Sequence, residues 1–498
     1  MPPTTHSTAA VAAAITALPH AMLARICSLL PTGDAIATVP RLNKALAAVT
    51  APRAANVRAE LAAAEGLGWP MSAGVELFTI PLWALQEAWP QLDRLQRMRA
   101  AVRAAFHGDL ATLRWALPQR DDTGLLYCAA AAAGGQLEAL QCALALGCEW
   151  GDCTCEAAAQ SGQLATLQWL RAREPPCPWD EWTCNAAAEG GQLAVLQWLR
   201  AQEPPCLWDA LVCVTAASCG HLPMLQWART QEPPCPWDKR VCTYAAENGH
   251  LAVLQWLRAQ DPPCPWDKQT CSAAARSGHL AVLQWARAQQ PPCSWDASIC
   301  IAAAKGGHLD VLQWARAQQP PRPWDERTCT AAAEGGHLAV LQWARAQEPP
   351  CPWDDDTCSH AAGCGHLAVL QWARAQEPPC PWDEGTCSQA AEGGHLAVLQ
   401  WVRAQQPPCP WDEWTCIAAA ERGHLAVLQW LRAQEPPCPW DKRTCTKAAE
   451  GGHLAMLQWA RAQEPPCPWN AQDCFRRAAD GATAGWIRAQ AALEGVVV

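Results

Sequence analysis

Cysteine and histidine recur at fixed spacing along this 498-residue chain, and they are the first side chains that could do chemistry. In the set Cys351, Cys358 and His366, the second cysteine follows the first by seven positions, and the histidine follows by eight more. Thiolate and imidazole are the ligands that zinc prefers, so a repeated thiol-rich metal site is one hypothesis. Structural zinc sites, however, need four ligands and usually hold cysteines two to four residues apart.

A structural role for these residues is therefore favoured. The first cysteine is replaced by Arg322 in one copy with no other change, which a metal ligand would not tolerate. A cysteine on a helix packs as a small apolar side chain, and the histidine belongs to a turn between helices. We expect no metal, no cofactor and free thiols, including Cys177 and Cys184, in a reducing compartment.

Catalytic motifs do not stand out either. The sequence holds no G-x-S-x-G elbow, no phosphate-binding loop and no H-E-x-x-H pair. We therefore expect a protein that is not an enzyme. The formal net charge of −10 argues against a general nucleic-acid partner, which usually needs a basic surface, so none is expected.

The elements that carry these residues are repeats, marked by 30 Trp beside only 2 Tyr and 3 Phe. One Trp series recurs every 29 residues from Trp150 to Trp469, and a second, Trp169 to Trp459, follows it 19 residues later. Such a period predicts a solenoid of about fourteen units over residues 100–490, with a tail at 491–498.

Each unit is expected to form two short helices. Asp180 can cap the first helix, whose small side chains, such as Cys184 and Ala188, form a narrow apolar face. Gly190-Gly191 ends that helix, and a second, nearly surrounded helix follows at about 193–202. The EPPCP segment stops it, because proline lacks an N–H and clashes within a helix.

The stretch TCTAAAEGGHLAVLQWARAQ, which starts at Thr328, resembles the ankyrin repeat in its A-A-x-x-G-H-L-x-V-L pattern. The unit is shorter than the usual 33 residues, and W-D-x-x-T-C replaces the family's T-P-L-H turn. The resemblance is to a short, Trp-, Cys- and Pro-rich variety found in algal, protist and giant-virus proteins. It implies an all-α fold, a helix-pair solenoid of about fourteen ankyrin-like repeats with a small N-terminal helical module. It also implies a non-catalytic protein-protein interaction scaffold.

The N-terminal region is expected to comprise a disordered segment (1–15), a helical module (16–55) and a helical linker (56–99). The module resembles an F-box, which docks on the adaptor subunit of a cullin-type ubiquitin ligase. The resemblance implies that the adaptor contact is made by Leu18, Pro19, Leu23, Ile26 and Leu30. The alternative is a plain helical cap on a bare scaffold without a ubiquitin role.

Differences between copies concentrate two, three, six and seven residues after the loop Trp. Spacings of three to five residues place these positions on one face of the first helix. Stacked units would line them into one strip, which we interpret as a surface for a protein partner; neutral drift is the alternative. The strip comprises Glu181, Trp182, Asn185, Lys239, Arg240, Tyr244, Glu326, Arg327, Asp355, Asp356, His360, Gln389, Glu413, Trp414, Lys442, Arg443 and Lys447. Trp182 and Trp414 are the main candidates for contact with a partner, because exposed Trp is common in binding hot spots.

Targeting signals are weak. No basic region of a secretory signal precedes the apolar stretch at 9–18, and no run of 18 apolar residues predicts a membrane span. A transit peptide stays open, since acidic residues are absent before Asp34. We expect an intracellular protein, cytoplasmic or nuclear, with no membrane partner.

Overall fold

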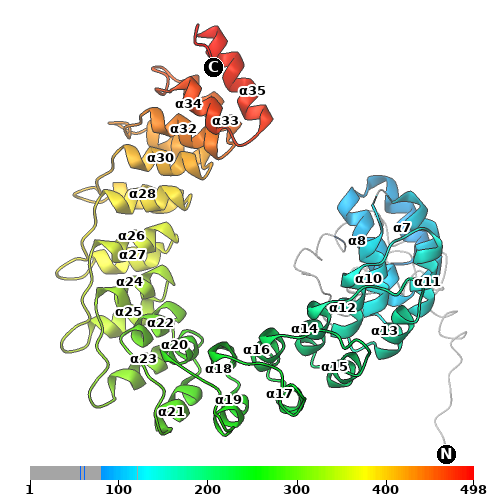
Figure 1. Cartoon of the computed structure of the whole chain (residues 1–498). Coiled ribbons are helices and arrows are strands. Elements are labelled where there is room, and N and C mark those ends of the chain that lie inside the picture. The colour runs from blue at the N-terminus through cyan, green and yellow to red at the C-terminus, as the bar shows by residue number, and fades with distance from the viewer. Residues whose placement is uncertain (1–56, 58–60, 62–79, 121) are drawn as a thin grey trace, which may run out of the picture. The chain divides into compact units, whose positions relative to one another are not determined.

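A computed structural model describes residues 57, 61, 80–120 and 122–498 of the chain (Figure 1). All regular secondary structure in these ranges is helical, which confirms the predicted all-α class. The F-box-like segment at 16–55, with Leu18, Pro19, Leu23, Ile26 and Leu30, lies outside the described residues. The chain divides into two units, Met1–Val241 and Cys242–Val498, and each is described by itself.

In the described part of the first unit, a first helix and a second helix alternate along the chain. The short helix α7 (Leu82–Ala88) and the 3-10 turns η2 (Trp89–Gln91) and η3 (Leu117–Gln119) accompany them. The first helices are α8 (Arg94–His107), α10 (Leu125–Ala133), α12 (Asp152–Gln160), α14 (Glu181–Glu189) and α16 (Ala210–Ser218). The second helices are α9 (Leu110–Ala116), α11 (Leu137–Ala145), α13 (Leu164–Arg171), α15 (Leu193–Arg200) and α17 (Leu222–Arg229).

The second unit continues the same alternation, and α18 (Lys239–Glu247) crosses the division. Its first helices are α20 (Lys268–Arg276), α22 (Ser298–Gly306), α24 (Glu326–Glu334), α26 (Asp355–Gly363), α28 (Glu384–Glu392), α30 (Glu413–Glu421), α32 (Lys442–Glu450) and α34 (Ala471–Arg477). Its second helices are α19 (Leu251–Arg258), α21 (Leu280–Ala288), α23 (Leu309–Arg316), α25 (Leu338–Arg345), α27 (Leu367–Arg374), α29 (Leu396–Arg403), α31 (Leu425–Arg432), α33 (Leu454–Arg461) and α35 (Gly481–Leu493). Helices α8 to α35 thus form fourteen consecutive pairs, as the period predicted.

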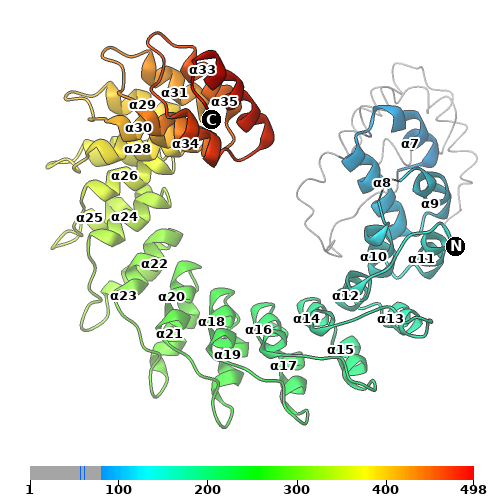
Figure 2. The same cartoon turned by 45° about the horizontal axis from the view of Figure 1, so that its top comes forward.

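First helices pack directly on one another, which their small side chains permit. In α14 the buried residues are Thr183, Cys184, Ala187 and Ala188, the face that the sequence predicted. Helix α14 lies against both α12 and α16, and in the second unit α26 lies against α28. Figure 1 and Figure 2 show the first helices of the second unit following one another from α22 to α30. The core of each unit runs along this row.

Second helices are more open than the sequence indicated. Helix α15 buries Val195, Leu196 and Leu199 against the core and exposes Ala194 and Gln197. Because α15 contacts mainly its own α14, one side of it faces water. The expectation of a nearly surrounded helix is therefore wrong, and the helix is amphipathic instead.

The turn between the two helices also links neighbouring repeats. Gly336 has φ +72°, a backbone conformation that L side chains rarely adopt. A Cβ at this glycine would lie 2.6 Å from the imidazole of His366 in the next repeat. The Nε2 atom of His366 contacts the carbonyl oxygen of Glu334 at 3.0 Å, so the histidine has a structural role in the turn.

The proline-rich loop ends in a Trp whose ring contacts both its own repeat and the preceding one. The loop begins with a cis peptide bond, as at Glu174–Pro175, and runs extended to Trp179. The Trp179 ring meets the Trp198 ring edge-on, with centroids 5.8 Å apart. From the preceding repeat, the Arg171 guanidinium lies 3.9 Å over Trp179 and donates a 2.5 Å hydrogen bond to the Cys177 carbonyl.

This arrangement, the Arg–Trp joint, recurs through both units. Arg229 lies 4.0 Å over Trp237 in the first unit, and Arg403 lies 3.8 Å over Trp411 in the second. At the C-terminal end Trp486, which is out of register in the sequence, still meets Trp469 at 6.3 Å. The recurrent arginine fastens each second helix to the next repeat.

Candidate functional site

The variable strip occupies the first, second, fifth and sixth residues of the first helices. Its first two positions begin these helices, because Asp180 caps α14 by accepting a 2.9 Å hydrogen bond from the Trp182 amide. Asp412 caps α30 in the same way, accepting from the Trp414 amide at 3.0 Å. Neighbouring first helices pack together within each unit, so these positions adjoin from repeat to repeat.

Most of the predicted strip residues face solvent. The exposed members are Glu181, Trp182, Lys239, Arg240, Tyr244, Glu326, Arg327, Asp355, Asp356, His360, Gln389, Trp414 and Lys442. The half-buried members are Asn185, Glu413, Arg443 and Lys447. Trp182 and Trp414 are 52% and 51% exposed, which is unusual for so large an apolar side chain. The strip therefore offers two indoles on a repeated frame.

Several strip residues already make contacts within the protein, and Asn185 and Lys447 are two of them. The Asn185 carboxamide oxygen accepts a 2.6 Å hydrogen bond from the Thr215 hydroxyl of the next repeat. Lys447 forms ion pairs with Glu421 at 3.0 Å and Glu450 at 3.2 Å. The positions six and seven residues after the loop Trp lie where first helices meet, so their variation reflects packing as well as exposure.

The strip of the second unit is strongly acidic from α26 to α30. Asp354, Asp383 and Asp412 precede these three helices, and burial raises the pKa of each carboxyl above its ordinary value. Neighbouring carboxylates add to this effect: Asp355 of the preceding repeat raises the pKa of Asp383. These helix starts repel one another and attract positive charge.

The cysteines pair in a way that the sequence spacing did not suggest. The Sγ atom of Cys184 in α14 lies 3.9 Å from the carbonyl oxygen of Cys206, in the loop after α15. The Cys206 thiol in turn donates a 3.1 Å hydrogen bond to the Asp180 carbonyl. Both cysteines are buried and neither forms a disulfide. The pair therefore ties the loop to the start of its own repeat.

The zinc hypothesis fails on this geometry for the trio that prompted it. Cys351 pairs with Cys329, and Cys358 pairs with Cys380. The ligand atoms of Cys351, Cys358 and His366 do not gather within 4.8 Å of one another, as a shared ion would require. Cys300 faces Arg322 in place of a second thiol, and burial raises its pKa to about 11.

One group of carboxylates lies close together in the first unit. Oxygen atoms of Asp152, Glu156 and Asp180 lie within 4.8 Å of one another, and this is the one such group of potential metal ligands among the described residues. Burial, then the charges of Asp180 and Asp152, raise the pKa of Glu156. Exposed acidic groups of this kind are common without an ion, so the group adds negative charge to the strip.

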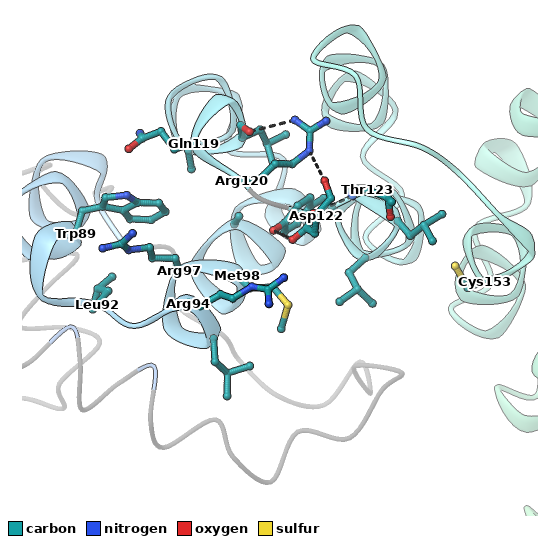
Figure 3. Close-up of a pocket in the computed structure, with 18 residues that line it drawn as sticks. Trp89, Leu92, Arg94, Arg97, Met98, Gln119, Arg120, Asp122, Thr123 and Cys153 are labelled. Atoms are coloured by element: carbon teal, nitrogen blue, oxygen red, sulfur yellow. Dashed lines mark hydrogen bonds between the residues drawn. The ribbon is translucent and has the colours of Figure 1, made fainter. Parts of the chain in front are cut away.

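A hollow of about 820 Å³ lies at the start of the first unit (Figure 3). Trp89, Met98 and other apolar side chains line it, together with Arg120 and Asp122. The Arg120 guanidinium donates to the carbonyls of Leu117, Leu146 and Gly147, among others, and the Asp122 carboxylate accepts from the Tyr127 hydroxyl. These two polar groups hold the backbone together and are not available as an acid-base pair.

No protein-family model and no curated relative matches this chain. Among solved structures, the chain is similar to the pentatricopeptide repeat protein PPR10 in complex with an 18-nt psaJ RNA element, at 12% identity and a TM-score of 0.28. The match covers 98% of this chain and 89% of that chain. It is also similar to PPR10 from maize, at 11% identity and a TM-score of 0.21, covering 96% of each chain. These are helical-repeat proteins, and likeness at such scores assigns no ligand to this chain.

The comparison does correct one expectation. Nucleic acid was excluded on net charge, yet a helical-repeat protein that this chain is similar to is solved in complex with RNA. Net charge is a sum over the chain and does not by itself show how charge is distributed locally. The exclusion is wrong and is withdrawn. Within the part of the chain that the structure describes, none of the helices combines the length and the hydropathy that a membrane span requires.

Proposed function

We propose that this chain is a non-catalytic scaffold that binds a protein partner along the first-helix strip. The observation that supports this proposal is the exposure of two large apolar side chains. Trp182 and Trp414 are 52% and 51% exposed, on helices whose other faces are packed. Trp is enriched in binding hot spots because it buries a large area with few rotatable bonds. Rigid repeats behind a variable surface suit recognition, since little order is lost on binding.

The test compares three forms of the whole chain as bait, each with and without nuclease treatment. The double variant Trp182→Ala, Trp414→Ala should lose proteins that the wild type retains. The matched control is Leu493→Ala, because Leu493 is 83% exposed and lies at the end of α35, a second helix that is not part of the strip. If all three forms retain the same proteins, the strip is not the binding surface. If nuclease alone removes them, nucleic acid mediates the contact.

A finer proposal concerns the class of the repeats and the N-terminal module. The A-A-x-x-G-H-L-x-V-L pattern supports an ankyrin-like repeat, and the Leu18-Pro19 segment supports an F-box-like module that recruits a ubiquitin-ligase adaptor. Both rest on sequence resemblance. The double variant Leu23→Asp, Ile26→Asp in the full chain should abolish adaptor binding while the strip keeps its partner. If neither the wild type nor the double variant binds the adaptor, the proposal reduces to a bare scaffold without a ubiquitin role. The free thiols suit a cytoplasmic or nuclear location.

A further inference from the structure

Trp414 is already in contact with an arginine, and this contact shows what its surface can bind. The Arg443 guanidinium lies 4.3 Å over the Trp414 ring. It also lies 3.3 Å from a carboxylate oxygen of Glu413 and 2.8 Å from one of Asp441. One indole face and two carboxylates thus hold one guanidinium, a set of contacts that we name the arginine clamp.

The first unit repeats the clamp residues but lacks the arginine. Glu181, Trp182 and Asp209 stand at the positions of Glu413, Trp414 and Asp441, while Leu211 stands where Arg443 does. The local backbone is the same at this last position. The amide of Leu211 donates to Asp209 and the amide of Arg443 donates to Asp441, both at 2.8 Å.

No Lys or Arg of the described part of the chain forms an ion pair with Glu181 or Asp209. The Asp152, Glu156 and Asp180 group adds negative charge beside them, since Asp180 precedes Glu181. The Trp182 indole is as exposed as Trp414. The equivalent surface in the first unit therefore has the acceptors and the aromatic face without a cation of its own.

We infer that Glu181, Trp182 and Asp209 bind an arginine side chain of a protein partner, in the way that the second unit binds Arg443. The inference rests on the proposed function and names the chemistry of the ligand. A guanidinium is favoured over an ammonium because its planar face stacks on an indole while its N–H groups reach carboxylates. Arginine would contribute both contacts in one side chain.

The two clamps supply matched variants in the full-length protein. Leu211→Arg should fill the first clamp, and Arg443→Leu should open the second. Each substitution installs the residue that the other repeat already carries, so both variants should fold. The probe is a blocked pentapeptide, Gly-Gly-Arg-Gly-Gly, with a lysine version for comparison, and saturation-transfer NMR of the peptide measures binding.

Wild type should bind the arginine peptide, and Leu211→Arg should weaken binding about tenfold, the loss expected for one stacked, ion-paired side chain. Arg443→Leu should raise the bound peptide from about one to about two per chain. The lysine peptide should bind more weakly. Equal binding by Leu211→Arg and wild type, or by both peptides, overturns the inference. The inference is also overturned if Leu211→Arg loses the binding of a single-stranded RNA oligonucleotide and keeps the binding of the peptide.

Failure of the inference is distinguishable from failure of the proposed function. If Trp182→Ala loses protein partners but Leu211→Arg keeps them, the strip binds protein without an arginine and only the inference fails. If the peptide results hold but the Trp double variant retains every protein, the clamp is real and the strip is not the partner surface.

Discussion

The Arg–Trp joint should be a principal source of stability between repeats, and Arg403 in the second unit tests it. Its guanidinium lies 3.8 Å over Trp411 and donates a 2.5 Å hydrogen bond to the Cys409 carbonyl. The substitution Arg403→Met keeps the apolar stem and removes both interactions. A hydrogen bond from a charged donor contributes about 1.5–3 kcal/mol, and a cation–π contact about 0.5–1 kcal/mol. The expected loss is about 3 kcal/mol.

Hydrogen exchange followed by mass spectrometry is the suitable assay, because long repeat arrays open in parts and not all at once. A loss of about 3 kcal/mol corresponds to roughly 150-fold faster exchange of amides in α29 and α30. Peptides from α20 and α21 should be unaffected, since coupling falls off along the array. The control is Arg422→Met, whose side chain is 60% exposed in its ion pair with Glu392 and should change nothing measurable.

A double-mutant cycle separates the two parts of the joint. Trp411→Leu removes the aromatic face and leaves the hydrogen bond of Arg403 to the Cys409 carbonyl. The two substitutions together should cost about 1 kcal/mol less than the sum of their separate effects, because each removes the same cation–π contact. Protection in Arg403→Met within about threefold of wild type would refute the role assigned to the joint.

Three other predictions concern turns, charges and thiols. Gly336→Ala should lower the melting temperature, because φ is +72° and the new Cβ would strike His366, whereas Gly485→Ala, in a helix with open space around it, should be neutral or stabilising. Burial, and then the charge of Asp355, raises the pKa of Asp383, so the folded state binds more protons than the unfolded chain and the ionised carboxyl destabilises the fold above about pH 4. Asp383→Asn should therefore raise stability to urea at pH 7, and this gain should disappear as the pH falls towards 4; a gain that persists there would contradict the electrostatic cause. In native protein, iodoacetamide should label the exposed Cys219 and Cys364 well before the buried Cys184 and Cys206, which peptide mapping measures; equal labelling would contradict the burial.

Much of the single repeat could be predicted from sequence, because its determinants are local. Asp180 caps the helix that follows it, and Gly336 ends one helix at a positive φ. Apolar spacing identified the buried face of α14 at Cys184 and Ala188. Each of these features depends on residues within about one helical turn, where spacing fixes geometry.

What the sequence did not reveal depends on the path of the loop. Arg171 and Trp179 are eight residues apart, and nothing in their spacing shows that the extended loop returns the ring beneath the guanidinium. Cys184 meets Cys206, 22 residues later, because the second helix runs back along the first. Asn185 was assigned to a binding surface because it varies, but it bonds to Thr215. Variation alone does not separate a surface position from one between repeats.

The Arg–Trp joint has a consequence for how this chain can change over generations. Every joint uses the same two residue types at the same spacing, so removing or duplicating 29 codons rejoins an arginine to a Trp at the new junction. Recombination between near-identical copies can therefore alter the number of repeats without creating a mismatched boundary. Trp182 and Trp414 stand 232 residues apart, which is eight times 29. Recombination in the segment between these two residues would change the number of residues that separate the two clamps by a multiple of 29, and it would leave each clamp intact.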